Sequence, residues 1–185
     1  MEGYWQRVAE MGKDDSPYRA TFAQIICVAE TDAEAERVYG PHVSYFFNRC
    51  LHIYPGFVDA PGYRTIKTIQ AEFLSQMARP NIGQAASLSW GELNERGYIV
   101  AGCPDTVRQR MEELIRTLRV GNIICGIHVG NMPPEKTRHS TELFARKVMP
   151  QLRGIWKDYE SDERFWIHPL PKRVAPATIA AETVR

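Results

Sequence analysis

The chain has 185 residues, of which 44% are hydrophobic and 24% are charged, a composition typical of a globular protein with one core. Its 23 basic and 22 acidic side chains give a formal net charge of +1, so the charge balance predicts no binding to nucleic acid or to an anionic membrane. No apolar stretch approaches the ~20 residues that span a bilayer. The amino-terminal stretch MEGYWQRVAE lacks the regions of a signal peptide, so we expect a cytoplasmic protein.

The first predicted unit is a strand followed by a helix. Residues 20–29, ATFAQIICVA, are rich in β-branched and aromatic types and contain neither Gly nor Pro, which favours a strand. Thr31 or Asp32 follows as a plausible helix N-cap. The sequence after it predicts a helix that extends at least to Tyr39.

A second strand is predicted at residues 98–101 and is followed by Gly102-Cys103-Pro104-Asp105. Pro104 suits the first position of a helix. The apolar residues that come after it have the spacing of one buried helical face: Val107, Met111, Leu114, Ile115 and Leu118. A third strand, residues 122–128, leads in the same way to a helix predicted from about Ser140 to Leu152.

Strands that alternate with helices in this way indicate an α/β fold with a parallel sheet. Residues 48–97 interrupt the alternation, because proline and glycine punctuate a segment longer than ordinary βα or αβ connections. Such a segment is typical of a lid or a binding loop. We place one region at residues 1–153, with 48–97 as its insertion, and expect residues 154–185, which contain several prolines, to be an extension or arm.

The four cysteines are far apart in the sequence, and no pair has the C-x-x-C spacing of a zinc or redox centre. We expect them to be buried free thiols, because free cysteine behaves as a small hydrophobic residue. The histidines likewise show no metal-ligand spacing. The sequence therefore predicts no metal site.

Four phrases in chain order resemble a known family, and they are VAETDAEA (28–35), APGY (60–63), GCPDTV (102–107) and ELFARKVMP (142–150). Together they resemble the C-terminal half of bacterial-luciferase-like flavin-dependent monooxygenases. The resemblance implies a (β/α)8 TIM-barrel fold and reduced FMN supplied by a separate flavin reductase. It also implies that O2 is used to oxygenate a small organic substrate. The three βα units would be the last three of the barrel, and the segment 48–97 would cover the mouth of the active site.

The chain departs from this family in its length. A TIM barrel needs eight strands and typically ~250 residues, whereas three strands are predicted here. Three parallel strands leave an open edge that favours association. We therefore expect a fragment, one part of a two-chain barrel completed by a missing N-terminal half, or a homo-oligomer.

Two other functions stay open at this point. The chain can be a non-catalytic truncated half-barrel that acts as an oligomerisation or flavin-binding module. It can also be an unrelated α/β domain that shares only the alternation of strands and helices. Many flavin contacts of the family, including those to the phosphate, come from the N-terminal half, so no cofactor-binding residue is assigned here.

Active sites of barrels lie at the carboxyl ends of the strands, which makes His128 the candidate catalytic residue. An imidazole there can hydrogen-bond a flavin edge or move a proton at neutral pH. The alternative is a structural histidine satisfied by a backbone carbonyl. Asn131 is a candidate to orient the substrate, but the preferred interpretation is a left-handed turn position after Gly130, where Asn is tolerated.

Two further sets of residues follow from the resemblance. The turn Gly102-Cys103-Pro104-Asp105 can hold a phosphate at a helix N-terminus, but it has one glycine and an acidic residue, so a structural turn is the preferred interpretation. In the insertion, aromatic and basic side chains can seal the mouth against water and hold an anionic group, and the residues in question are Tyr54, Tyr63, Arg64 and Lys67. The alternative for these four is an ordinary solvated loop.

Overall fold

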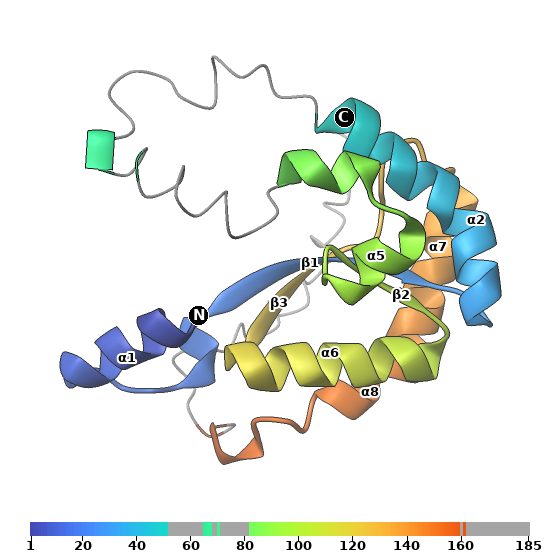
Figure 1. The fold of residues 1–185 in the computed structure, drawn as a ribbon. Coiled ribbons are helices and arrows are strands. Elements are labelled where there is room, and N and C mark those ends of the chain that lie inside the picture. The colour runs from blue at the N-terminus through green and yellow to red at the C-terminus, as the bar shows by residue number, and fades with distance from the viewer. Residues whose placement is uncertain (52–64, 68–69, 71–81, 160, 162–185) are drawn as a thin grey trace, which may run out of the picture.

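A computed structural model describes residues 1–51, 65–67, 70, 82–159 and 161 (Figure 1). The three predicted βα units are present, and their strands form one parallel sheet. Most of a helix that the sequence allows at residues 66–78 lies outside the described residues. The α/β class and the parallel sheet are therefore confirmed for the described part of the chain.

The first unit consists of β1 (Thr21–Val28) and α2 (Asp32–Tyr45). The hydroxyl of Thr31 accepts a hydrogen bond from the Glu34 N–H at 3.1 Å, so Thr31 is the N-cap residue of α2. The helix extends beyond Tyr39 and continues as a π-helical turn at Phe46–Cys50.

The second and third units are β2 (Ile99–Gly102) with α6 (Pro104–Leu118), and β3 (Asn122–Gly126) with α7 (Pro134–Leu143). Pro104 occupies the first turn of α6, as predicted. In contrast, α7 begins well before the expected residue 140, because the fixed φ angle of Pro134 suits a first helical turn. A π-helical turn at Phe144–Val148 and the short α8 (Met149–Leu152) continue α7.

Two helices were not predicted, α1 (Glu2–Glu10) and α5 (Trp90–Glu95). A reciprocal capping box starts α5: the Ser89 N–H donates to the Glu92 carboxylate at 2.9 Å, and the Glu92 N–H donates to the Ser89 hydroxyl at 3.3 Å. A 3-10 helix at Ile82–Ser87 precedes α5, and both elements bury residues in the core, Ala85 and Leu93. The end of the expected insertion is therefore a core element.

The sheet has the strand order β2-β1-β3. Val28 of β1 is aligned with Gly102 of β2, and Ile25 of β1 is aligned with Gly126 of β3. Three consecutive strands of a barrel would place the second strand in the middle, whereas here the first strand is central, so the expectation that these units are the last three of a barrel is wrong. Within the described residues the sheet stays open, and no closed barrel is formed.

Helices cover both faces of the sheet (Figure 1). On one face, α2 packs against Cys27, Ala29 and Ala101. On the other face, α6 and the π-helical turn Phe144–Val148 pack against Ile26 and Val28. Because the carboxyl half of β1 is buried on both faces, its residues form an unbroken apolar run, as is typical of a parallel strand between two helical layers.

The carboxyl end of β1 extends beyond the end of β3. The N–H and the carbonyl of Val28 therefore have no strand partner on that side, and two side chains bind them instead. The hydroxyl of Ser140 on α7 accepts the Val28 N–H at 2.9 Å, and the Tyr39 hydroxyl donates to the Val28 carbonyl at 3.0 Å. Both side chains are fully buried. Burial raises the pKa of the Tyr39 phenol to about 12, so this group remains a donor. These bonds attach α2 and α7 to the sheet.

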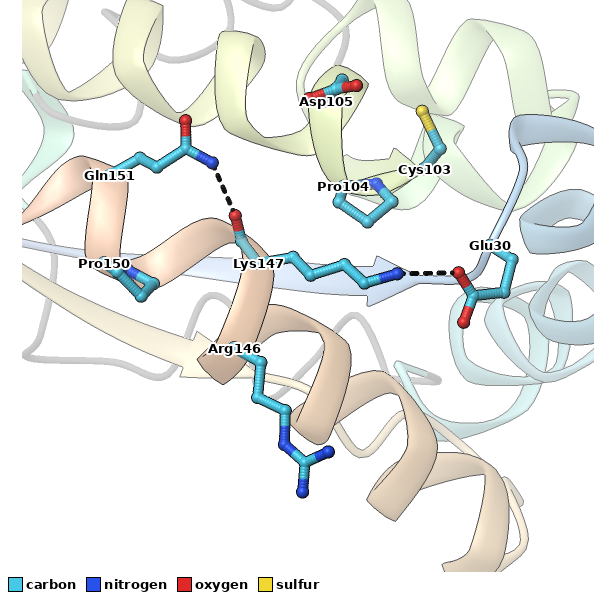
Figure 2. A pocket seen from close by; sticks show the side chains of 8 residues that line it. All are labelled: Glu30, Cys103, Pro104, Asp105, Arg146, Lys147, Pro150 and Gln151. Carbon is cyan, nitrogen blue, oxygen red and sulfur yellow. Dashed lines mark hydrogen bonds and ion pairs between the residues drawn. The ribbon is translucent and has the colours of Figure 1, made fainter.

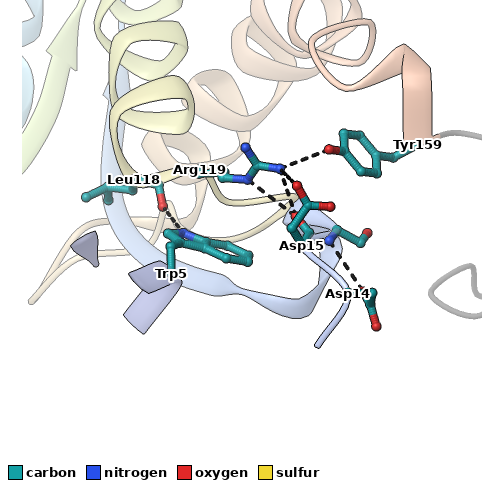
Figure 3. A network of polar contacts seen from close by, with 7 residues as sticks. Trp5, Asp14, Asp15, Leu118, Arg119 and Tyr159 are labelled. Atoms are coloured by element: carbon teal, nitrogen blue, oxygen red, sulfur yellow. Dashed lines mark hydrogen bonds and ion pairs between the residues drawn. The ribbon is translucent and has the colours of Figure 1, made fainter. Parts of the chain in front are cut away.

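At the opposite end of the sheet, Arg119 closes α6 in a left-handed conformation with φ of 50°. Its guanidinium donates to the Asp15 carboxylate at 2.6 Å and to the Tyr159 hydroxyl at 2.9 Å. It also lies 5.5 Å from the ring centre of Trp5, which donates to the Leu118 carbonyl (Figure 3). This network joins α1 and the start of the predicted extension to α6, so that the extension begins as a packed segment.

All four cysteines are free thiols. Cys27 is buried, and burial raises the pKa of its thiol to about 12. Cys103 is half-buried, whereas Cys50 and Cys125 are exposed, so the expectation of buried thiols is wrong for those two. Among the described helices none is both long and apolar enough to cross a membrane, and the described residues contain no cluster of three metal-ligating side chains.

Candidate functional site

The three parallel strands end at the same edge of the sheet, and this edge carries the candidate site. Glu30 follows β1, Cys103 follows β2, and His128 follows β3. The chain passes from β1 to β2 on one side and then returns to place β3 on the other side. In open α/β sheets, the carboxyl edge beside such a change of direction is where ligands commonly bind.

A cavity of about 480 Å³ opens at this edge, beside the amino end of α6. Its lining residues come from the loops after β1 and β2, from the first turn of α6, and from the helical segment after α7: Glu30, Cys103, Pro104, Asp105, Arg146, Lys147, Pro150 and Gln151 (Figure 2). The Lys147 ammonium lies 3.0 Å from the Glu30 carboxylate. Arg146 points away from this ion pair in Figure 2, so the two cations do not converge on one point.

The turn at residues 102–105 is occupied by a carboxylate of the chain itself. Asp32, in the first turn of α2, accepts the Cys103 N–H at 2.6 Å and the Thr106 hydroxyl at 3.1 Å. The hydrogen bond from the Cys103 backbone lowers the pKa of Asp32. The carboxylate therefore takes the place at the N-terminus of α6 that a bound phosphate would need, which favours the structural interpretation of the turn.

Replacement of Asp32 by asparagine, which keeps an acceptor oxygen but removes the charge, is expected to destabilise the chain at pH 7 by about 0.5 kcal/mol, the usual contribution of an exposed charge at a helix N-terminus. Because the folded-state pKa of Asp32 is lowered, its contribution is present above the unfolded-state pKa of about 3.9 and is lost as the pH falls through the folded-state value. The difference in melting temperature between the two proteins should therefore shrink as the pH is lowered from 7 to 3. A constant difference over this range would show that the carboxylate charge does not contribute.

The candidate catalytic residue His128 is exposed. Its Nδ1 atom lies 2.9 Å from the hydroxyl of Thr137, in the first turns of α7. The alternative of a histidine satisfied by a backbone carbonyl is therefore not what the structure has, because the partner is a side chain. Among the described residues no partner reaches Nε2, so this nitrogen is available to a ligand at the carboxyl edge.

Asn131 lies in a polar chain that includes a residue missed from the sequence, His42 of α2. The Asn131 Oδ1 atom is 2.8 Å from His42 Nδ1, and the Lys136 ammonium is 3.1 Å from His42 Nε2. Since the ammonium can only donate, Nε2 accepts and Nδ1 donates to Asn131. Asn131 lies in the turn that the Met132 N–H closes on the Val129 carbonyl at 3.1 Å, as expected. The left-handed residue of this turn is Gly130, with φ of 58°, so only the left-handed conformation expected of Asn131 is wrong.

The predicted lid residues are not tested by these contacts. Tyr54, Tyr63 and Arg64 lie outside the described residues. Lys67 is described and exposed. The described part of the chain thus holds two separate polar groups, the His128–Thr137 pair and the chain of Asn131, His42 and Lys136. Neither group lines the cavity beside α6.

Comparison with known proteins finds a likeness of fold to a solved structure. No family model matches the chain, and no curated protein sequence matches it. A solved structure is similar with a TM-score of 0.52 and 19% sequence identity, over 82% of this chain and 38% of the other. That protein is a type II Baeyer-Villiger monooxygenase, the oxygenating constituent of 3,6-diketocamphane monooxygenase from the CAM plasmid of Pseudomonas putida, in complex with FMN. The chain described here therefore spans well under half the length of that protein, and the likeness is one of fold.

Proposed function

We propose that this chain is the carboxyl-terminal portion of a luciferase-like, FMN-dependent monooxygenase. It would use reduced FMN, supplied by a separate reductase, and O2 to oxygenate a small organic substrate. The observation that carries the proposal is the likeness of fold to an oxygenating protein in complex with FMN. The four phrases in chain order that resemble the same kind of enzyme support it independently.

The described residues fit a flavin only in part. A volume of about 480 Å³ lies within the range of small-molecule sites, and Arg146 and Lys147 offer positive charge. However, Glu30 and Asp105 offset that charge, and Asp32 already accepts the donors at the start of α6. The only apolar lining is two prolines and a thiol, too little for a flavin ring. We infer that the remaining contacts to FMN come from outside this part of the chain.

The roles proposed for this chain's residues are to handle protons and to position groups. Reduced FMN would supply the electrons that activate O2. His128 would give or take a proton at Nε2 while Thr137 fixes its ring through Nδ1. Asn131 would orient the substrate, held in place by His42. Tyr54, Tyr63 and Arg64 remain proposed as lid residues that exclude water.

Titration with FMN tests the proposal. The chain is mixed with FMN, alone and together with a chain that supplies the amino-terminal part of such an enzyme, and flavin fluorescence is measured. Substrate-dependent consumption of O2 is then followed with reduced FMN. We expect weak binding by the chain alone, and tight binding with O2 consumption in the mixture. Failure to bind FMN in both settings would exclude the proposed function.

Replacement of His128 by alanine is expected to lower the rate of substrate oxygenation by about 100-fold in the complete enzyme, the lower limit for loss of a general acid or base, and with it the product formed per reduced FMN. Affinity for FMN should change little, since the imidazole is assigned to proton transfer. His139, an exposed histidine on the same helix as Thr137, provides the matched control, and its alanine variant should behave as the wild type. If both variants gave the same product yield as the wild type, His128 would be a structural residue.

The second candidate function is a non-catalytic module for oligomerisation or flavin binding. What favours it is that the free end of β1 is closed by Ser140 and Tyr39, which suits a unit that is stable without further strands. This function predicts a folded oligomer that never consumes O2, with or without an amino-terminal chain. Light scattering combined with the O2 assay separates the two candidates.

A further inference from the structure

The polar chain of Lys136, His42 and Asn131 permits only one arrangement of protons. The Lys136 ammonium lies 3.1 Å from His42 Nε2, and His42 Nδ1 lies 2.8 Å from Asn131 Oδ1. An ammonium cannot accept a hydrogen bond, so Nε2 carries the lone pair and Nδ1 carries the proton. If the Asn131 amide were turned over, its NH2 group would face this N–H, and two donors would meet. The ammonium therefore fixes the direction of an amide through the imidazole that lies between them.

The position of Lys136 is not explained by the helix that carries it. Lys136 is the third residue of α7, where a positive charge opposes the helix dipole. Among the described residues no carboxylate forms an ion pair with it. Its ammonium instead contacts His42 Nε2 and, at 3.5 Å, the Val38 carbonyl, both on α2. Since Lys136 and His42 are half-buried, the contact with the imidazole is what gives this charge a role.

Asn131 is the exposed end of this polar chain. It lies in the connection between β3 and α7, on the carboxyl side of the sheet. Because its Oδ1 is bound to His42 of α2, its NH2 group points away from that contact. In the part of the chain that the structure describes, no hydrogen bond uses this NH2 group. Asn131 therefore offers a donor in a fixed direction, whereas an unconstrained amide can offer either its donor or its acceptor.

We propose that Lys136 and His42 are positioning residues, which hold the Asn131 amide so that its NH2 group donates to an acceptor oxygen of the ligand. The proposal rests on the proposed function only in treating Asn131 as a residue that orients the substrate, since the arrangement of protons does not depend on flavin. It makes Asn131 a specificity residue. A ligand whose polar group accepts a hydrogen bond is favoured, and one whose polar group can only donate meets a second donor, which disfavours it.

The first experiment observes the His42 tautomer by nitrogen NMR of the full chain at about pH 8, above the ordinary titration range of histidine. The His42 signal is identified by its loss in His42→Gln, and we expect a proton on Nδ1 and a lone pair on Nε2. Lys136→Met keeps a side chain of similar length without a donor, and should give a mixture of both tautomers. Lys136→Arg, which can only donate, should restore the single tautomer. A wild type protonated at Nε2, or a Lys136→Met variant that keeps the wild-type tautomer, would overturn the proposal.

The second experiment tests the donor with Asn131→Asp, whose carboxylate still accepts from His42 Nδ1 but has no NH2 group. Binding of two probes of similar shape is measured by NMR, to the chain alone and together with the amino-terminal chain. Cyclohexanone can only accept a hydrogen bond, and cyclohexylammonium can only donate one. We expect the wild type to prefer cyclohexanone. Asn131→Asp should shift the ratio of the two dissociation constants towards the ammonium by at least about tenfold, the usual effect of a hydrogen bond to a charged group.

Asn48→Asp is the matched control, because it makes the same change of charge at another exposed asparagine, and it should keep the wild-type ratio. A ratio that Asn131→Asp leaves unchanged, or no binding of either probe in either setting, would overturn the role of Asn131 as a donor to the ligand. Both experiments are carried out without FMN. A failure to bind FMN or to consume O2 would therefore exclude the proposed function, while the tautomer and the ratio of dissociation constants would still decide this inference.

Discussion

Replacement of Gly130 by alanine is expected to lower the free energy of unfolding by about 3 kcal/mol, because it combines backbone strain with overpacking. Gly130 has φ of 58°, which L-residues rarely adopt. A Cβ atom there would lie 2.5 Å from the His42 carbonyl oxygen and 3.2 Å from the Phe46 nitrogen. Both of these are backbone atoms of α2 and the turn after it, so neither can rotate away.

Gly97 provides a control that separates the two causes. Its φ is 74°, but a Cβ atom there would meet nothing within 4 Å. Gly97→Ala should therefore cost only the backbone term, about 1 kcal/mol. Urea denaturation of both variants measures the difference. Equal losses would show that the contact between the β3–α7 connection and α2 does not constrain the fold.

The position of Gly130 also connects stability to the site. It lies between His128, which bonds to Thr137, and Asn131, which bonds to His42. A displacement of this turn would move both side chains relative to α2 and α7. We therefore expect Gly130→Ala to weaken the proposed proton transfer even at temperatures where the chain stays folded.

The sequence predicted those features that depend on neighbouring residues. The apolar runs of the three strands, Thr31 as an N-cap and Pro104 at the start of α6 are local signals, and the structure has them where expected. The capping box of Ser89 and Glu92 is a signal of the same kind. It was missed because the surrounding proline and glycine residues suggested an irregular segment.

Features that depend on distant parts of the chain could not be predicted in this way. The central place of β1 is decided by which strands pair, and periodicity does not carry that information. Asp32 contacts Cys103 across 71 positions of sequence, and His42 contacts Asn131 across 89. Asp32 and His42 both lie on α2, and nothing in the sequence distinguishes either one from an ordinary residue of that helix. Only the fold reveals that α2 supports both parts of the carboxyl edge.

Replacement of Ser140 by alanine is the second change expected to have a large effect, a loss of about 2 kcal/mol. The Val28 N–H that Ser140 accepts is fully buried and faces the side where β3 has already ended. Alanine fills the same space without an acceptor, so the variant leaves a buried donor unsatisfied, which costs more than a hydrogen bond contributes.

Ser16 is the matched control, because it is also buried but its hydroxyl has no hydrogen-bond partner within the described residues. Ser16→Ala should leave the free energy of unfolding unchanged or raise it, since it removes a buried polar group that is not satisfied. Both variants are compared by chemical denaturation, with Tyr39→Phe as a third. Tyr39→Phe removes the donor to the Val28 carbonyl and should cost about 1 kcal/mol. If Ser140→Ala lowered the free energy of unfolding no more than Ser16→Ala does, the end of β1 would not depend on α7 for its hydrogen bonds. A further strand, rather than a helix, would then be the expected hydrogen-bond partner of that end.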